Sequence, residues 1–128
     1  MKYLILVLLC SSILSCNSVK KIERALNSGN YTEAINRSVN KLQKNKSNGK
    51  SAVYASLLKQ SFEKYRKSTL DRIDFLEKET LKDNSKQVYE LYVKLRSIQN
   101  RVKPLMPLEN EYGENIIFEF YDFSDNIL

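Results

Sequence analysis

The stretch SKQVYELYVKLRSIQNRVKP, residues 85–104, decides the fold class of this chain. Apolar residues recur in it every three or four positions, which places them along one face of an α-helix. The polar residues 83–85 offer an N-cap, with Gln87 three positions after Asn84 as in a capping box, and Pro104 ends the helix because proline cannot continue it. The apolar stripe consists of Val88, Leu91, Tyr92, Leu95, Ile98 and Val102.

The same spacing predicts three more helices toward the N-terminus. A short helix closes at Ser28-Gly29, and a second begins at Asn30, with Glu33 placed to complete a capping box. The third runs from Ser51 to near Leu81, either as one long helix, which we favour, or as two joined near Ser68. Their stripes are Val19, Ile22 and Leu26; Tyr31, Ala34, Ile35, Val39 and Leu42; and Val53, Tyr54, Leu57, Leu58, Phe62, Tyr65, Thr69, Ile73 and Leu76.

Past Pro104 the pattern changes. Pro107 bars a helix, and residues 116–123 are apolar and aromatic apart from two charges, which is typical of an extended or β-strand segment. A lone strand cannot satisfy its own backbone, so it must pair within the tail, lie on the helices, or pair with something beyond the chain as given. Because residues 124–128 look like the start of another helix, we expect a truncated chain or a C-terminus that needs a partner. The alternative is that the apolar residues of this segment pack on the helices and that the last residues form a frayed tail.

Length and composition exclude several function classes. The 128 residues suffice for one domain, and 21 Lys and Arg against 15 Asp and Glu give a formal charge of +6. His is absent, and both Cys lie within the first sixteen residues. Zinc sites, Ser–His–Asp triads and Cys–His dyads are therefore excluded, and we expect neither a metal nor a cofactor.

The first sixteen residues have the layout of an export signal. Lys2 provides a positive start and residues 3–9 an apolar run, which is interrupted too early for a membrane span of about 20 residues. The sequence Ile13-Leu14-Ser15-Cys16 resembles the lipobox of bacterial lipoproteins, with an aliphatic residue three places before the Cys and a small one directly before it. Cys10 lacks the small preceding residue. An ordinary secretory signal with a chance Cys is the alternative.

The lipoprotein resemblance implies diacylglyceryl attachment to the Cys16 thiol, cleavage after Ser15 and acylation of the new amino terminus. Several acyl chains, at about 0.8 kcal/mol per buried methylene, anchor a protein stably. Asn17, where an Asp would favour inner-membrane retention, implies sorting to the outer membrane. The periplasmic side is then the default, with the inner membrane and the cell surface left open.

Residues 29–35, GNYTEAI, resemble the turn and second-helix start of a tetratricopeptide repeat. In that family Gly allows a tight reversal, Tyr fills the space between helices, and small Ala lets them approach. A shift of 34 residues places Gly29 on Glu63, so a second repeat is not recognised. The resemblance implies antiparallel helical hairpins with a binding surface, and it names no ligand.

Two sets of residues have spacings that catalysis can use. Asp71 and Asp74 could share a helix face as a cation site or carboxylate pair, but Lys67 and Lys78 stand four residues from them, which favours weak surface ion pairs. Ser and Lys three residues apart recur without a Gly-rich oxyanion turn beside them. We therefore predict no catalytic residue.

Basic residues gather in the polar loop around residues 41–50 and beside the predicted anchor. An exported protein does not meet nucleic acid, so we exclude it as a partner. The basic residues then either belong to a solvated loop or attract anionic lipid or polysaccharide. Lys20, Lys21 and Arg24 follow the anchor, so they are the better candidates for membrane contact; an ordinary basic tether is the alternative.

Aromatic residues concentrate in the last third of the chain, and we expect most of them in the core. Any exposed remainder would form a patch that binds a partner or stacks on a sugar, because aromatic rings supply rigid area at low entropy cost. The candidate partner-binding residues are Tyr112, Phe118, Phe120, Tyr121 and Phe123.

Together these features predict an all-α, repeat-like helical lipoprotein that acts without catalysis as a scaffold or interaction module in a cell-envelope complex. The alternative is capture of a glycan or lipid by the C-terminal aromatic residues, and hydrolysis by carboxylates is a distant third. The expected divisions are a signal peptide (residues 1–15), a lipidated tether (16–18), a helical domain (19–103) and an extended aromatic segment (104–128).

Overall fold

The computed structural model describes residues 17–44 and 49–125, and its regular structure there is helical. Residues 17–27 form an N-terminal helix, followed by α2 (Tyr31–Lys44), α3 (Ser51–Lys78), α4 (Ser85–Val102) and the short 3-10 helix η1 (Lys103–Leu105). These described ranges contain no β-strand, so the all-α prediction is confirmed. Cys16 and the lipobox, most of the 45–50 loop and the end of the predicted C-terminal helix lie outside the described residues.

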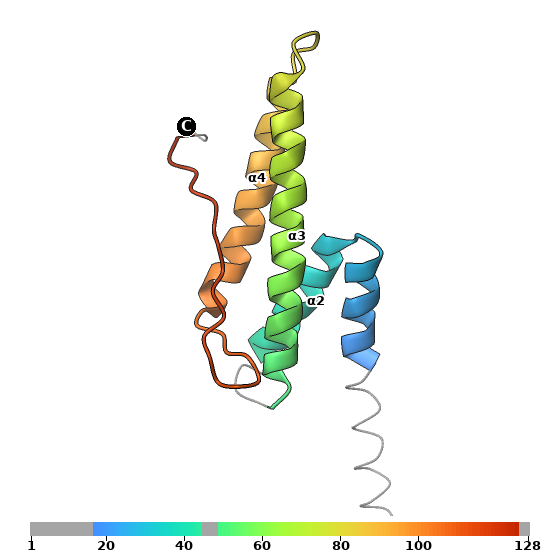
Figure 1. The fold of residues 1–128 in the computed structure, drawn as a ribbon, viewed down its shortest axis with the longest axis vertical. Coiled ribbons are helices and arrows are strands. Elements are labelled where there is room, and N and C mark those ends of the chain that lie inside the picture. Colours follow the sequence, from blue (N-terminus) through green and yellow to red (C-terminus); the bar gives the residue numbers. More distant parts are fainter. Residues whose placement is uncertain (1–16, 45–48, 126–128) are drawn as a thin grey trace, which may run out of the picture.

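The helices run alternately up and down the long axis of the molecule (Figure 1). The N-terminal helix and α2 form one hairpin, and α3 and α4 form a second one. At 28 residues α3 is about 42 Å long, twice the length of the 14-residue α2. Its upper half therefore extends past α2 with α4 beside it. The prediction of one long helix is confirmed, although α3 ends at Lys78 rather than near Leu81.

The turn between the N-terminal helix and α2 is a Schellman motif. Gly29 has φ +80°, its N–H donates to the Leu26 carbonyl at 3.2 Å, and the Asn30 N–H donates to the Ala25 carbonyl at 2.9 Å. Asn30 then caps α2, because its Oδ1 accepts the Glu33 N–H at 3.3 Å. The Glu33 carboxylate pairs with Arg37 at 2.6 Å, so the predicted capping box forms in one direction.

The predicted capping box at Asn84 is wrong, since the Asn84 side chain makes no cap hydrogen bond on α4. Its Nδ2 donates instead to the Leu76 carbonyl at 3.2 Å and to the Glu79 carboxylate at 3.0 Å. Asn84 thus ties the start of α4 to the end of α3. Asp83 holds the turn, because it accepts the Ser85 N–H at 3.0 Å.

One hydrophobic core occupies the lower half of the molecule, where the N-terminal helix, α2, α3 and the end of α4 meet. Two serines are buried, and their hydroxyls are satisfied within their own helices: Ser38 donates to the Ala34 carbonyl at 2.8 Å and Ser61 to the Leu57 carbonyl at 2.7 Å. A second buried group, Ile73, Leu76, Tyr92 and Leu95, joins the upper parts of α3 and α4. The largest members of the main core include Ile22, Ile35, Leu42, Leu58, Phe62, Ile98 and Val102.

After η1 the chain makes a tight turn and then runs back along the helices. An isolated antiparallel bridge joins Glu109 and Asn115, and the Ile116 N–H donates to the Leu108 carbonyl at 2.7 Å. Residues 116–125, which we call the C-terminal strap, then ascend beside α3 and α4 (Figure 1). Of the three possibilities left open by the sequence, the segment lies on the helices, and it forms no strand.

We expect Gly29→Ala to destabilise the fold by about 1 kcal/mol, because a residue with a Cβ is strained at φ +80°. The nearest atoms leave room for the methyl group, so the cost is one of backbone conformation. Urea unfolding midpoints measure it. Gly49→Ala is the matched control: Gly49 has equal space and no positive φ, so its variant should be neutral or slightly stabilised. Equal losses at both positions would contradict this account of the turn.

Candidate functional site

The five predicted partner-binding residues lie in three different places. Tyr112 stands on the turn before the strap and is 86% exposed. Phe118 and Phe120 pack on α3, whereas Tyr121 and Phe123 pack on α4. The aromatic pattern in the sequence therefore identifies the C-terminal segment as a whole. In the fold, some of its aromatic side chains pack on the helices and others are exposed.

Phe118 and Phe120 attach the strap to the main core. Their ring centroids lie 5.9 and 5.5 Å from that of Phe62, which is fully buried. Lys59 lies over the Phe118 ring at 5.6 Å, and Lys103 lies over the Phe120 ring at 5.3 Å. The faces of both rings are thus largely used within the protein.

Tyr92, Tyr121 and Phe123 form a second aromatic cluster higher on α4. Tyr121 lies 5.7 Å from Tyr92 and 5.0 Å from Phe123, and Tyr92 lies 6.3 Å from Phe123. Tyr121 and Phe123 remain half-exposed. Tyr89, whose side chain is 56% exposed, lies one helical turn before Tyr92 on α4. We call Tyr89, Tyr121 and Phe123 the α4–strap surface.

A buried glutamine holds the strap at the level of this cluster. Gln99 is 1% exposed; its Nε2 donates to the Tyr121 carbonyl at 3.0 Å, and its Oε1 accepts the Tyr121 N–H at 2.7 Å. The Gln99 side-chain amide therefore makes the two hydrogen bonds that a neighbouring β-strand would otherwise make to the backbone of Tyr121. In the sequence Gln99 directly follows Ile98, a member of the apolar stripe. This position is the one sequence feature that indicates burial of the Gln99 side chain.

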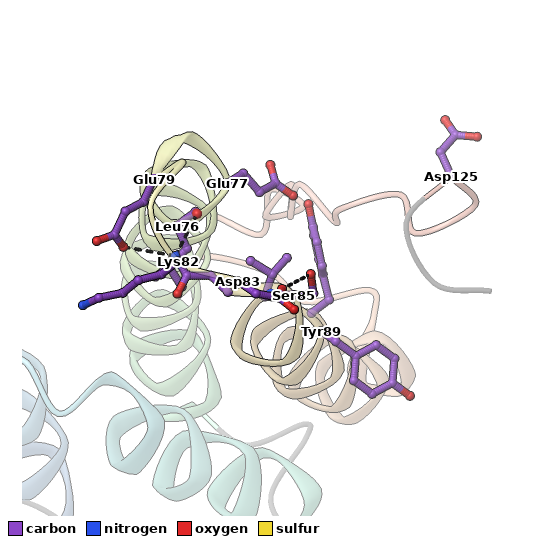
Figure 2. Close-up of a pocket in the computed structure, with 11 residues that line it drawn as sticks. Leu76, Glu77, Glu79, Lys82, Asp83, Ser85, Tyr89 and Asp125 are labelled. Carbon is purple, nitrogen blue, oxygen red and sulfur yellow. Dashed lines mark hydrogen bonds between the residues drawn. The ribbon is translucent and has the colours of Figure 1, made fainter.

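A cleft of about 560 Å³ opens at the top of the α3–α4 hairpin. Figure 2 shows Glu79 on the α3 side of it and Asp125 apart on the strap. The walls come from the end of α3, the connecting loop, the start of α4 and the strap. They include Leu76, Glu77, Glu79, Lys82, Asp83, Asn84, Ser85, Val88, Tyr89, Tyr92 and Asp125.

The cleft is acidic, with four carboxylates against the one ammonium group of Lys82. Hydrogen bonds from the Ser85 hydroxyl and N–H lower the pKa of Asp83, so this carboxylate stays charged. Burial raises the pKa of Tyr92, and its hydrogen bond with Tyr121 and the nearby charge of Glu77 raise it further. Tyr92 is therefore a neutral phenol that donates and packs, and it cannot serve as a base near neutral pH.

The predicted ion pairs of the acidic α3 cluster are present. Lys67 contacts Asp71 and Lys78 contacts Asp74, both at 2.7 Å and on exposed surface. In the described ranges no three Cys, Asp or Glu side chains are grouped so that they could hold a metal ion. The chemistry that the cleft and the α4–strap surface offer is hydrogen bonding, charge and aromatic contact.

Comparison with protein-family models, curated proteins and solved structures finds no match to this chain. Among the described helices, none combines the length and the apolar character needed to cross a membrane.

We expect Gln99→Ala to loosen the strap, because the Tyr121 N–H and carbonyl lose their partner, at a cost of about 1–3 kcal/mol. Amide hydrogen exchange at Tyr121 should accelerate while the core of α3 stays protected. Gln87→Ala is the control, since Gln87 is exposed on the same helix and its removal should change stability by less than about 0.5 kcal/mol. Unchanged exchange in Gln99→Ala would show that the aromatic contacts alone hold the strap.

Proposed function

We propose that this chain is a lipoprotein, acylated at Cys16, on the periplasmic side of the outer membrane, where it acts as a non-catalytic helical interaction module in an envelope complex. The sequence Ile13-Leu14-Ser15-Cys16 supports the anchor. The observation that carries the binding role is the α4–strap surface: Tyr89 is exposed and lies one helical turn from Tyr92, which contacts the half-exposed rings of Tyr121 and Phe123. Aromatic residues set in a rigid surface are common centres of protein interfaces.

The hairpin of the N-terminal helix and α2 is, in this proposal, a single tetratricopeptide-like unit. Its support is local: Gly29 has the positive φ of a tight reversal, Tyr31 is half-buried, and Ala34 is fully buried where α2 meets the core. The long α3 and α4 would then extend this unit and present the partner surface.

We favour protein contact over glycan or lipid capture because the Phe118 and Phe120 rings pack against other side chains of the same protein. Sugar stacking needs an open ring face, but Phe118 is buried and Phe120 packs between Phe62 and Lys103. Hydrolysis by carboxylates is not favoured, since Asp71 and Asp74 each have a Lys partner on exposed surface. Half-exposed aromatic rings held in place by a folded framework are typical of the centre of a protein interface.

Labelled palmitate tests the anchor. The wild-type chain should take up label and sediment with membranes, whereas Cys16→Ser should take up none and remain unprocessed, because the thiol is the acceptor. Cys10→Ser is the matched control in the same segment and should behave as the wild type. Label that persists in Cys16→Ser, or that disappears in Cys10→Ser, would refute acylation at Cys16.

Cross-linking in cells followed by purification tests the binding role. Tyr89→Ala should reduce recovery of a stoichiometric envelope partner by at least about tenfold, the loss expected for an interface hot spot. Phe75→Ala is the control: Phe75 is 57% exposed against 56% for Tyr89, but it lies on α3, where Arg72 lies over its ring. Equal recovery from both variants would refute the α4–strap surface as the binding site.

A further inference from the structure

Positive charge is concentrated in the first third of the described chain. Residues 17–50 contain eight Lys and Arg against two Asp and Glu, whereas residues 51–128 contain twelve against thirteen. The first part thus has a net charge of +6 and the remainder −1. The hairpin that follows the predicted anchor, together with the two lysines of the loop after it, accounts for the basic character of the whole protein.

Both helices of this hairpin keep their cations on the side away from the core. The N-terminal helix buries Ile22 and Leu26 and exposes Lys20, Lys21 and Arg24. In α2, Arg37, Lys41 and Lys44 follow one another at four- and three-residue intervals, so they share one helix face. Arg37 is paired with Glu33.

Antiparallel packing brings the two sets of lysines to the same end of the molecule. Lys20 and Lys21 lie near the start of the N-terminal helix, Lys41 and Lys44 near the end of α2, and both helix ends point downward in Figure 1. The chain enters at this end, directly after Cys16. The turn that carries Glu109, Glu111 and Glu114 lies at the same lower end (Figure 1), and Glu109 and Glu111 line a pocket with Gly49 and Ser51 at the start of α3.

We propose that the outer side of this hairpin, formed by Lys20, Lys21, Arg24, Lys41 and Lys44, binds the headgroups of anionic phospholipids. The proposal rests on the anchor proposed above, which would hold Lys20 and Lys21 only a few residues from the membrane. Charge attraction acts over about 8 Å at physiological salt, so cations tethered this closely are within range. The contact would orient the protein, with the top of the α3–α4 hairpin and the α4–strap surface directed away from the membrane.

Lysine acetylation of the acylated protein on vesicles tests the orientation. On phosphatidylcholine vesicles containing phosphatidylglycerol, Lys20, Lys21, Lys41 and Lys44 should react about fivefold more slowly than on pure phosphatidylcholine, the factor that ~1 kcal/mol per lysine corresponds to. Lys82 and Lys86, exposed at the top of the molecule, are internal controls and should react equally on both. High salt should abolish the difference.

Charge reversal provides the matched variants. Lys41→Glu with Lys44→Glu should return the acetylation rates of Lys20 and Lys21 most of the way to those on neutral vesicles, whereas Lys82→Glu with Lys86→Glu should not. Equal rates on both vesicle types, or protection of Lys20 and Lys21 that ignores the α2 variant, would overturn the proposal. Flotation with neutral vesicles reports the anchor separately: a chain that floats without protection refutes only the orientation, and one that fails to float refutes the anchor.

Discussion

The contact of Phe62 with Phe118 and Phe120 joins the helical core to the C-terminal strap. Phe62 is fully buried in the middle of α3, and both strap rings lie within 6 Å of it, at 5.9 and 5.5 Å between centroids. Buried aromatic side chains each remove about 150–250 Å² from water, which corresponds to roughly 4–6 kcal/mol. A favourable term of this size, although partly offset by the entropy of ordering the chain, fixes the first half of the strap on α3.

The difference in length between α3 and α2 shapes the rest of the molecule. Because α2 covers only the lower half of α3, the upper half has α4 as its helical neighbour and depends on the strap and the Asn84 bridge for further support. A two-helix hairpin has too few neighbours to bury all its apolar residues. Phe75, Tyr89 and Val93 therefore remain exposed, and the acidic cleft opens between the helix ends.

The two ends of the molecule differ in chemistry, and the proposed functions follow this difference. The lower end carries the basic hairpin that follows the predicted lipid anchor, together with the acidic turn of residues 109–114, while the upper end is acidic in its cleft and exposes aromatic rings along α4. A surface rich in Lys suits anionic headgroups, whereas a rigid aromatic surface suits a protein partner. One protein could therefore contact a membrane and a partner at the same time.

Local patterns in the sequence determined the four helices, the Gly29 turn and the Asn30 cap, because each depends on residues within one or two helical turns of one another. The resemblance of Ile13-Leu14-Ser15-Cys16 to a lipobox also depends on sequence alone, since such a signal is linear, and it stays a prediction. Other contacts were decided by the tertiary structure: Asn84 bonds back to α3 instead of capping α4, the Gln99 amide binds the backbone of Tyr121, and Phe118 is buried while Tyr112 is exposed. The Gln99 and Phe118 side chains meet residues from other segments of the chain, and Asn84 bonds back across a turn; in each case packing determines which of several possible partners a side chain meets.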